Sequence, residues 1–142
     1  MASHVSALPE LSHGRPVSTI ERTQFSDGQP RPYSASAEVN RIIFLCGQVP
    51  TRPDGTTPPD IAGQVAQAFD NLENALLAAR SDLCSLLKLT VFLADLDEFE
   101  EYNAAYLTRL SGHPLPPRTT VQVARFRGEK RIEIDAVAAT TA

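Results

Sequence analysis

DIAGQVAQAFDNLENALLAA, residues 60–79, is the stretch that decides the fold. Its apolar residues recur at steps of three and four, which places them on one face of an amphipathic helix. These residues are Ile61, Val65, Ala68, Phe69, Leu72, Leu76 and Ala79. Asp60 has a side chain suited to cap the helix N-terminus. A helix with one apolar face must bury that face against another layer, so the sequence predicts a layered domain.

Three strands are predicted before this helix. The run Arg41–Gly47 holds five consecutive apolar residues and ends in glycine, which is typical of a strand buried on both faces. Residues 33–38 predict a second strand, and residues 19–25 a short strand at the sheet edge.

Three strands and one helix are predicted after it. Residues 87–93 alternate with period two. Asp97 lies three residues before Glu100, the spacing of a capping box, so a second helix is expected to start there. The apolar stripe of this helix consists of Phe99, Tyr102, Tyr106 and Leu110. Residues 118–126 and 131–138, joined by the polar turn at 127–130, predict an antiparallel hairpin.

The order β-β-β-α-β-α-β-β predicts an α+β two-layer domain in which two helices cover one face of a mixed sheet. The other face also needs a cover, because residues 118–126 present uncharged side chains on both sides for most of their length. Further copies of the chain are the economical candidate.

Composition narrows the class of protein. The 142 residues fit one domain, predicted to span residues 19–142, and we interpret residues 1–18 as a flexible N-terminal extension because they show no periodicity. The net charge of −4 argues against a nucleic-acid-binding protein. The sequence has no apolar run long enough to span a bilayer and no secretory signal, so we expect a cytoplasmic protein with reduced cysteines.

Several kinds of active site are excluded by motif. The sequence lacks GxGxxG, GxxxxGK[ST] and GxSxG, and its histidines lack the spacing of metal ligands. Arg118 opens an uncharged strand, where it would either grip a carboxylate or lie exposed at a strand end. Glu133 is either functional or part of a solvent face, and Gly47 either permits close approach of a ligand or marks a bulge. The basic residues at 125–131, with Glu129 among them, are interpreted as a solvated turn rather than as an RNA-binding patch.

Several colinear stretches resemble the RidA/YjgF family of reactive-intermediate imine deaminases, from about Thr19 to the C-terminus. The matching stretches are Pro32–Ser34, Ile42–Pro50, Asp60–Ile61, Gln64–Leu72, Val91–Asp95, Phe99, Tyr102–Asn103, Pro117–Arg125 and Ile132–Val137. The resemblance implies a fold similar to bacterial chorismate mutase and a homotrimer with clefts between subunits. It also implies hydrolysis of C=N bonds in 2-imino and enamino acids, of the 2-aminoacrylate type, to 2-keto acids and ammonia, with no metal and no organic cofactor.

The family's functional residues map onto positions of this chain. Arg118 corresponds to the carboxylate-binding arginine, and Glu133 to the acid that positions water. The substrate-binding positions correspond to Tyr33, Gly47, Asn103 and Thr120. Thr120 stands where the family often has Cys, at a position thought to act largely through its backbone.

Two alternatives to a general imine deaminase remain open. Arg31 stands where the family usually has Gly, and a cation there would favour a second carboxylate, as in a pathway-specific deaminase of an aminomuconate-type enamine. A non-catalytic ligand-binding or ribonuclease-like trimer is the other alternative, although the acidic net charge counts against RNA.

The predicted hairpin has a consequence for the site. Its pairing would put Arg118 opposite Ala139 and Glu133 opposite Ala124. The two residues would then lie about 20 Å apart, at roughly 3.3 Å per residue. We therefore expect Arg118 and Glu133 to meet only across a subunit boundary.

Overall fold

The computed structural model describes residues 18–141, so the predicted extension lies outside the described residues apart from Ser18. The element order matches the prediction. The elements are β1 (Glu21–Thr23), β2 (Ser36–Val39), β3 (Ile42–Leu45), α1 (Ile61–Ala78), η3 (Leu83–Ser85), β4 (Leu86–Leu93), η4 (Leu96–Glu98), α2 (Phe99–Arg109), β5 (Arg118–Gln122) and β6 (Ile132–Ala139). In this described part, no helix is long and apolar enough to cross a membrane.

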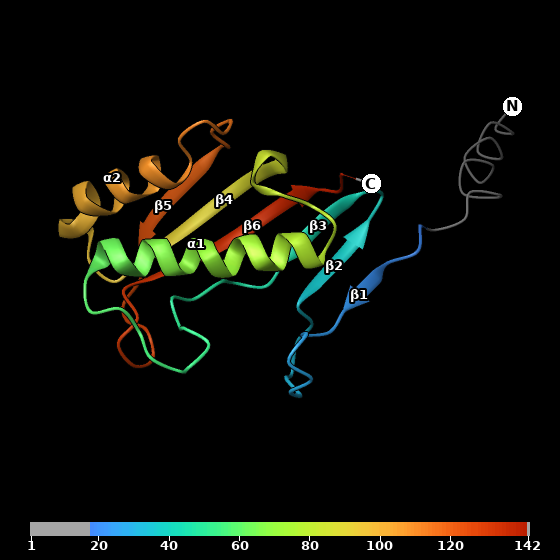
Figure 1. Ribbon diagram of the computed structural model, residues 1–142, viewed down its shortest axis with the longest axis horizontal. Coiled ribbons are helices and arrows are strands. Elements are labelled where there is room, and N and C mark those ends of the chain that lie inside the picture. The colour runs from blue at the N-terminus through green and yellow to red at the C-terminus, as the bar shows by residue number, and fades with distance from the viewer. Residues whose placement is uncertain (1–17, 142) are drawn as a thin grey trace, which may run out of the picture.

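The strands form one mixed sheet in the order β1-β2-β3-β6-β4-β5. Only β4 and β5 are parallel. Both helices lie on the same side of the sheet, and α1 crosses its central strands (Figure 1). The predicted apolar face of α1 is buried there, including Val65, Phe69 and Leu72, against Leu89 of β4 and Ile134 of β6. The predicted two-layer α+β domain is confirmed.

The predicted hairpin of the last two strands is wrong. β5 pairs in parallel with the outer edge of β4, whereas β6 lies between β3 and β4. The reason is burial: β6 carries Ile132 and Ile134, which are fully buried, whereas β5 reads Arg-Thr-Thr-Val-Gln and suits an edge. Residues 123–131 therefore cross the end of β4 instead of closing a tight turn.

The prediction that Arg41–Gly47 is buried on both faces is also wrong for this chain by itself. Ile43 and Leu45 are buried under the helices, but Ile42 is 38% and Phe44 50% exposed on the opposite face. Because both helices lie on one side, the other side of the sheet carries exposed apolar side chains. We call this side the open face; Val121 of β5 is 39% exposed on it.

The two helices begin differently. Asp60 caps α1 as predicted, since its Oδ1 accepts a hydrogen bond from the Gly63 amide at 2.8 Å. The capping box predicted at Asp97 is wrong. The side chain of Asp95 accepts from the Asp97 amide at the start of η4, and α2 begins only at Phe99, after an N-cap residue without a capping side chain.

Candidate active site

Arg118, Asn103 and Thr120 come together on the helix-covered side of the sheet; we call this group the arginine site. Arg118 is the first residue of β5 and pairs with the buried Leu89 of β4, so its side chain points toward α2. Its Nη1 donates a hydrogen bond to Asn103 Oδ1 at 2.8 Å. Thr120 Oγ1 lies 2.8 Å from the Tyr102 hydroxyl.

Aromatic rings surround the Arg118 guanidinium. Its Cζ lies 4.4 Å from the ring centre of Tyr106, 5.2 Å from that of Tyr102 and 5.7 Å from that of Phe99. Within residues 18–141, the arginines that pair with carboxylates are Arg31, Arg80, Arg109 and Arg131. Arg118 is a half-buried cation without such a partner, which is the state expected of a group that receives an anionic ligand.

Glu133 and Gly47 form a second group, the glutamate site, on the open face. Glu133 is the second residue of β6, and Gly47 follows β3 beside it. A Cβ atom at Gly47 would overlap Glu133 Oε2 and lie 3.0 Å from its Cδ. The sequence left a close approach and a bulge as alternatives for this glycine. In the structure the Glu133 carboxylate lies against Gly47, and the close approach of a ligand stays a prediction.

The environment of Glu133 favours its protonated form. Burial raises the pKa of this carboxyl above its usual value, and the neighbouring Asp135 carboxylate raises it further, whereas Lys130 opposes the shift. Burial also raises the pKa of the Cys46 thiol; the Arg31 charge opposes this rise, and Asp135 and Glu133 add to it. A carboxylate with a raised pKa is a stronger base than an ordinary surface glutamate.

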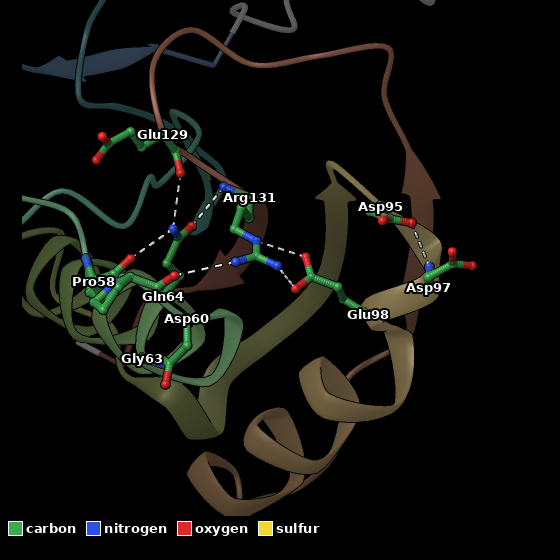
Figure 2. A network of polar contacts seen from close by, with 10 residues as sticks. Pro58, Asp60, Gly63, Gln64, Asp95, Asp97, Glu98, Glu129 and Arg131 are labelled. Atoms are coloured by element: carbon green, nitrogen blue, oxygen red, sulfur yellow. Dashed lines mark hydrogen bonds and ion pairs between the residues drawn. The ribbon is translucent and has the colours of Figure 1, made fainter.

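A polar network holds the segment that leads into β6 (Figure 2). Gln64 of α1 is buried; its amide donates to the carbonyls of Pro58 and Glu129, and its Oε1 accepts from the Arg131 amide at 2.7 Å. The Arg131 guanidinium pairs with the Glu98 carboxylate. The interpretation of residues 125–131 as a solvated turn is therefore wrong for Arg131, which anchors the chain two residues before Glu133.

The arginine and glutamate sites of one chain lie on opposite faces of the sheet. Arg118 pairs with Leu89 and Glu133 with Phe92, and these two β4 residues are three positions apart. Side chains alternate between faces along a strand, so the two functional side chains point in opposite directions. Strand spacing of about 4.8 Å and a rise of ~3.3 Å per residue place their Cα atoms about 14 Å apart. The predicted hairpin is absent, so the separation of about 20 Å expected from it is wrong, and the pairing through β4 gives about 14 Å instead.

Tyr33 belongs to neither site by its contacts. Its side chain is 56% exposed, and its ring packs edge-on against Phe25 at 5.7 Å. The Arg31 guanidinium stacks on the ring of the same Phe25. Both of its terminal nitrogens donate to the Asp27 carboxylate, at 2.8 and 3.0 Å. Arg31 and Cys46 line a cavity of about 580 Å³ between the N-terminal loop and α1. Because both terminal nitrogens of Arg31 bond the Asp27 carboxylate, Arg31 is not an unpaired cation for a second substrate carboxylate.

Sequence reasoning missed the aromatic surroundings of Arg118. The sequence pattern places Tyr102 and Tyr106 in the apolar stripe of the second helix and gives neither ring a place beside Arg118. The sequence nevertheless carried a signal for paired rings. Residues four apart lie on the same face of a helix, so the spacing of Tyr102 and Tyr106 places both rings together. That this face meets the first residue of β5 depends on the parallel pairing of β4 with β5.

The fold and these two sites define a small α+β protein with an unpaired arginine on one side of its sheet and a partly buried acid on the other. Among the residues that the structure describes, no cluster of three or more His, Cys, Asp or Glu side chains is placed to hold a metal ion. A family model described as Endoribonuclease L-PSP matches residues 28–140. The chain belongs to this family, and the resemblance to RidA/YjgF proteins is confirmed.

Similar proteins carry deaminase names. The 2-iminobutanoate/2-iminopropanoate deaminase of Escherichia coli K12 is 36% identical over 110 residues, which cover 75% of this chain and 86% of that protein. The Mus musculus protein of the same name is 38% identical over 109 residues, covering 75% of this chain and 80% of that protein. The crystal structure of E. coli TdcF with bound serine has a TM-score of 0.74 and 28% identity, covering 89% of this chain and 100% of that one.

Proposed function

We propose that this protein is a hydrolytic deaminase that converts reactive 2-imino and enamino acids to 2-keto acids and ammonia. The observation that carries the proposal is the Arg118 guanidinium, which is bonded to Asn103 but has no carboxylate partner in the described chain. A guanidinium can grip a substrate carboxylate at two points. The names of the deaminase relatives and the serine bound to TdcF, itself an amino acid with a carboxylate, support a substrate of this type.

The reaction needs few groups. In the substrate, C2 carries a protonated imine and is already electrophilic. Glu133 accepts a proton from water as the water oxygen bonds to C2, which gives a carbinolamine. Return of the proton makes the nitrogen an ammonium leaving group, and the C–N bond breaks as the hydroxyl oxygen forms the C=O bond and loses its proton. The departing ammonia takes up that proton, so the products are a 2-keto acid and an ammonium ion. An enamino acid first gains a proton at C3 to become the imine. Holding the water and the carboxylate in place supplies most of the required catalysis.

We further propose that the complete site forms between two chains of a homotrimer. Within one chain Arg118 and Glu133 lie on opposite faces of the sheet, so a small imino acid cannot contact both. The open face carries exposed Ile42, Phe44 and Val121, which a second copy would bury. A trimer places the glutamate site of one chain beside the arginine site of its neighbour.

Imine hydrolysis is the direct test. An amino acid oxidase generates the imino acid from alanine or 2-aminobutyrate, and semicarbazide traps the imine that the protein does not consume. We expect catalytic amounts of the protein to suppress semicarbazone formation while keto acid accumulates. An unchanged rate of semicarbazone formation would reject the proposal. Incubation with RNA in parallel tests the activity that the family description names.

Mixed assemblies test the shared site. Arg118→Ala and Glu133→Ala chains should each be inactive alone. When they are unfolded together and refolded, each mixed trimer contains one intact site, so part of the activity should return. Light scattering should give the mass of three 15.4 kDa chains. Confirmed mixed trimers without recovered activity would place both residues in a site of one chain.

A further inference from the structure

Arg118 and Arg109 show two ways of accommodating a cation beside α2. Arg109, on α2 itself, bonds the carboxylates of Asp70 and Glu73 at 2.7 and 3.1 Å, so its terminal nitrogens are occupied. Arg118 is approached instead by the rings of Phe99, Tyr102 and Tyr106. Ring faces attract a cation through their quadrupole and occupy none of its N–H donors.

We propose that Tyr106, with Tyr102 as a second wall, is a positioning residue that stabilises the unpaired Arg118 cation and keeps its N–H donors free for a substrate carboxylate. This inference deepens the proposed function and rests on it. A carboxylate partner in place of the rings would also stabilise the cation, but it would compete with the substrate.

The positions on α2 make this arrangement possible. Tyr102, Asn103 and Tyr106 are spaced by one, three and four residues, so their side chains converge on one end of β5. Asn103 accepts one guanidinium hydrogen bond and orients its plane, while the Tyr102 hydroxyl is tied to Thr120 on the next inward-facing position of β5. The rings of Tyr102 and Tyr106 also pack against each other, with centroids 6.1 Å apart.

The phenols stay neutral in this setting. Burial raises the pKa of both Tyr102 and Tyr106. The rise is only partly opposed, at Tyr102 by the hydrogen bond with Thr120 and then by the Arg118 charge, and at Tyr106 by the Arg118 charge. Neutral rings keep the electron-rich faces on which the attraction depends. Removing the hydroxyl alone should therefore matter much less than removing the ring.

Two substitutions at Tyr106 distinguish the effect of the aromatic ring from the effect of apolar packing. Tyr106→Phe keeps the aromatic face, whereas Tyr106→Leu keeps an apolar side chain without it. The control is Phe69→Leu, which removes a buried ring that packs on Tyr106 at 5.8 Å but makes no ring contact with Arg118. Binding of 2-ketobutyrate, a 2-keto acid of the proposed product class, is measured by calorimetry, and KM and kcat are measured for imine hydrolysis.

We expect Tyr106→Leu to weaken 2-ketobutyrate binding about tenfold and to raise KM by a similar factor with little change in kcat. Tyr106→Phe should restore wild-type binding, and Phe69→Leu should lower Tm without weakening binding. Equal losses in Tyr106→Leu and Phe69→Leu, or unchanged binding in Tyr106→Leu, would overturn the inference. If Arg118→Ala also binds 2-ketobutyrate normally, the proposed role of Arg118 fails instead.

Discussion

The two faces of the sheet differ in how completely a single chain forms the group of residues on each. On the helix-covered side, the arginine site is finished within one chain: Asn103 orients Arg118, and aromatic rings enclose it. On the open face, Glu133 lies in a gap left by Gly47, among apolar side chains that the chain itself does not cover. The difference teaches that folding of one chain is enough to arrange the proposed carboxylate-binding group, whereas the proposed hydrolytic step also depends on assembly.

The largest effect is expected on the open face, from Glu133→Gln. Glutamine fits the space beside Gly47 but cannot accept the proton of water, so kcat should fall about 10²- to 10⁴-fold while KM changes little. The control is Glu129→Gln, which removes an equal charge from an exposed side chain nearby, since Glu129 contributes only its carbonyl to the network around Gln64. Turnover near the wild-type value in Glu133→Gln would remove this residue from the mechanism.

Arg118→Lys comes next and concerns the other face. Lysine keeps the charge but cannot make a two-point contact with a carboxylate. The loss of one charged hydrogen bond, about 1.5–3 kcal/mol, predicts a fall in kcat/KM of roughly ten- to hundredfold. Arg127→Lys, at an exposed position, is the matched control. Unchanged kinetics in Arg118→Lys would mean that no two-point grip exists.

Gly47→Ala tests how closely the glutamate site is fitted. The added Cβ would overlap Glu133 Oε2, so the carboxylate must move and kcat should fall roughly tenfold, because small displacements of a reacting group are costly. Gly63→Ala is also crowded, though less closely, with its Cβ 2.7 Å from Asp60 Oδ1, and it disturbs the α1 cap. It should lower Tm and leave kcat unchanged. If both variants lose only stability, Gly47 has a structural role alone.

The smallest effects are shifts in pH dependence. Glu133 acts as a base only when ionised, so kcat/KM should decline as pH falls through its pKa, which burial and Asp135 hold above the usual range. Asp135→Asn removes the repulsive charge, lowers that pKa and should move the acidic limb to lower pH. Lys130→Met removes a favourable charge and should move the limb to higher pH. Shifts in the same direction for both variants would contradict the assignment of this limb to Glu133.

Elements with a strong local signal were predicted well. The periodicity of residues 61–79, with Asp60 directly before them, predicted α1 and its cap. The alternation at 87–93 predicted β4. Local signals were misleading where contacts with distant segments determine which strands pair. The turn at 127–130 favoured a hairpin, yet the connection crosses the end of β4, and Arg131 is held by Gln64 and Glu98 from distant segments.

The sequence by itself determined the order of the elements and the family, and it supplied the residues of the proposed site, because periodicity and motif are properties of neighbours along the chain. The tertiary structure alone decided that β6 inserts between β3 and β4, which puts Arg118 and Glu133 on opposite faces of one sheet. It also decided that Gly47 makes room for Glu133 and that aromatic rings enclose Arg118. The physical reason is that strand pairing depends on which residues the common core can bury, and that competition involves the whole chain at once.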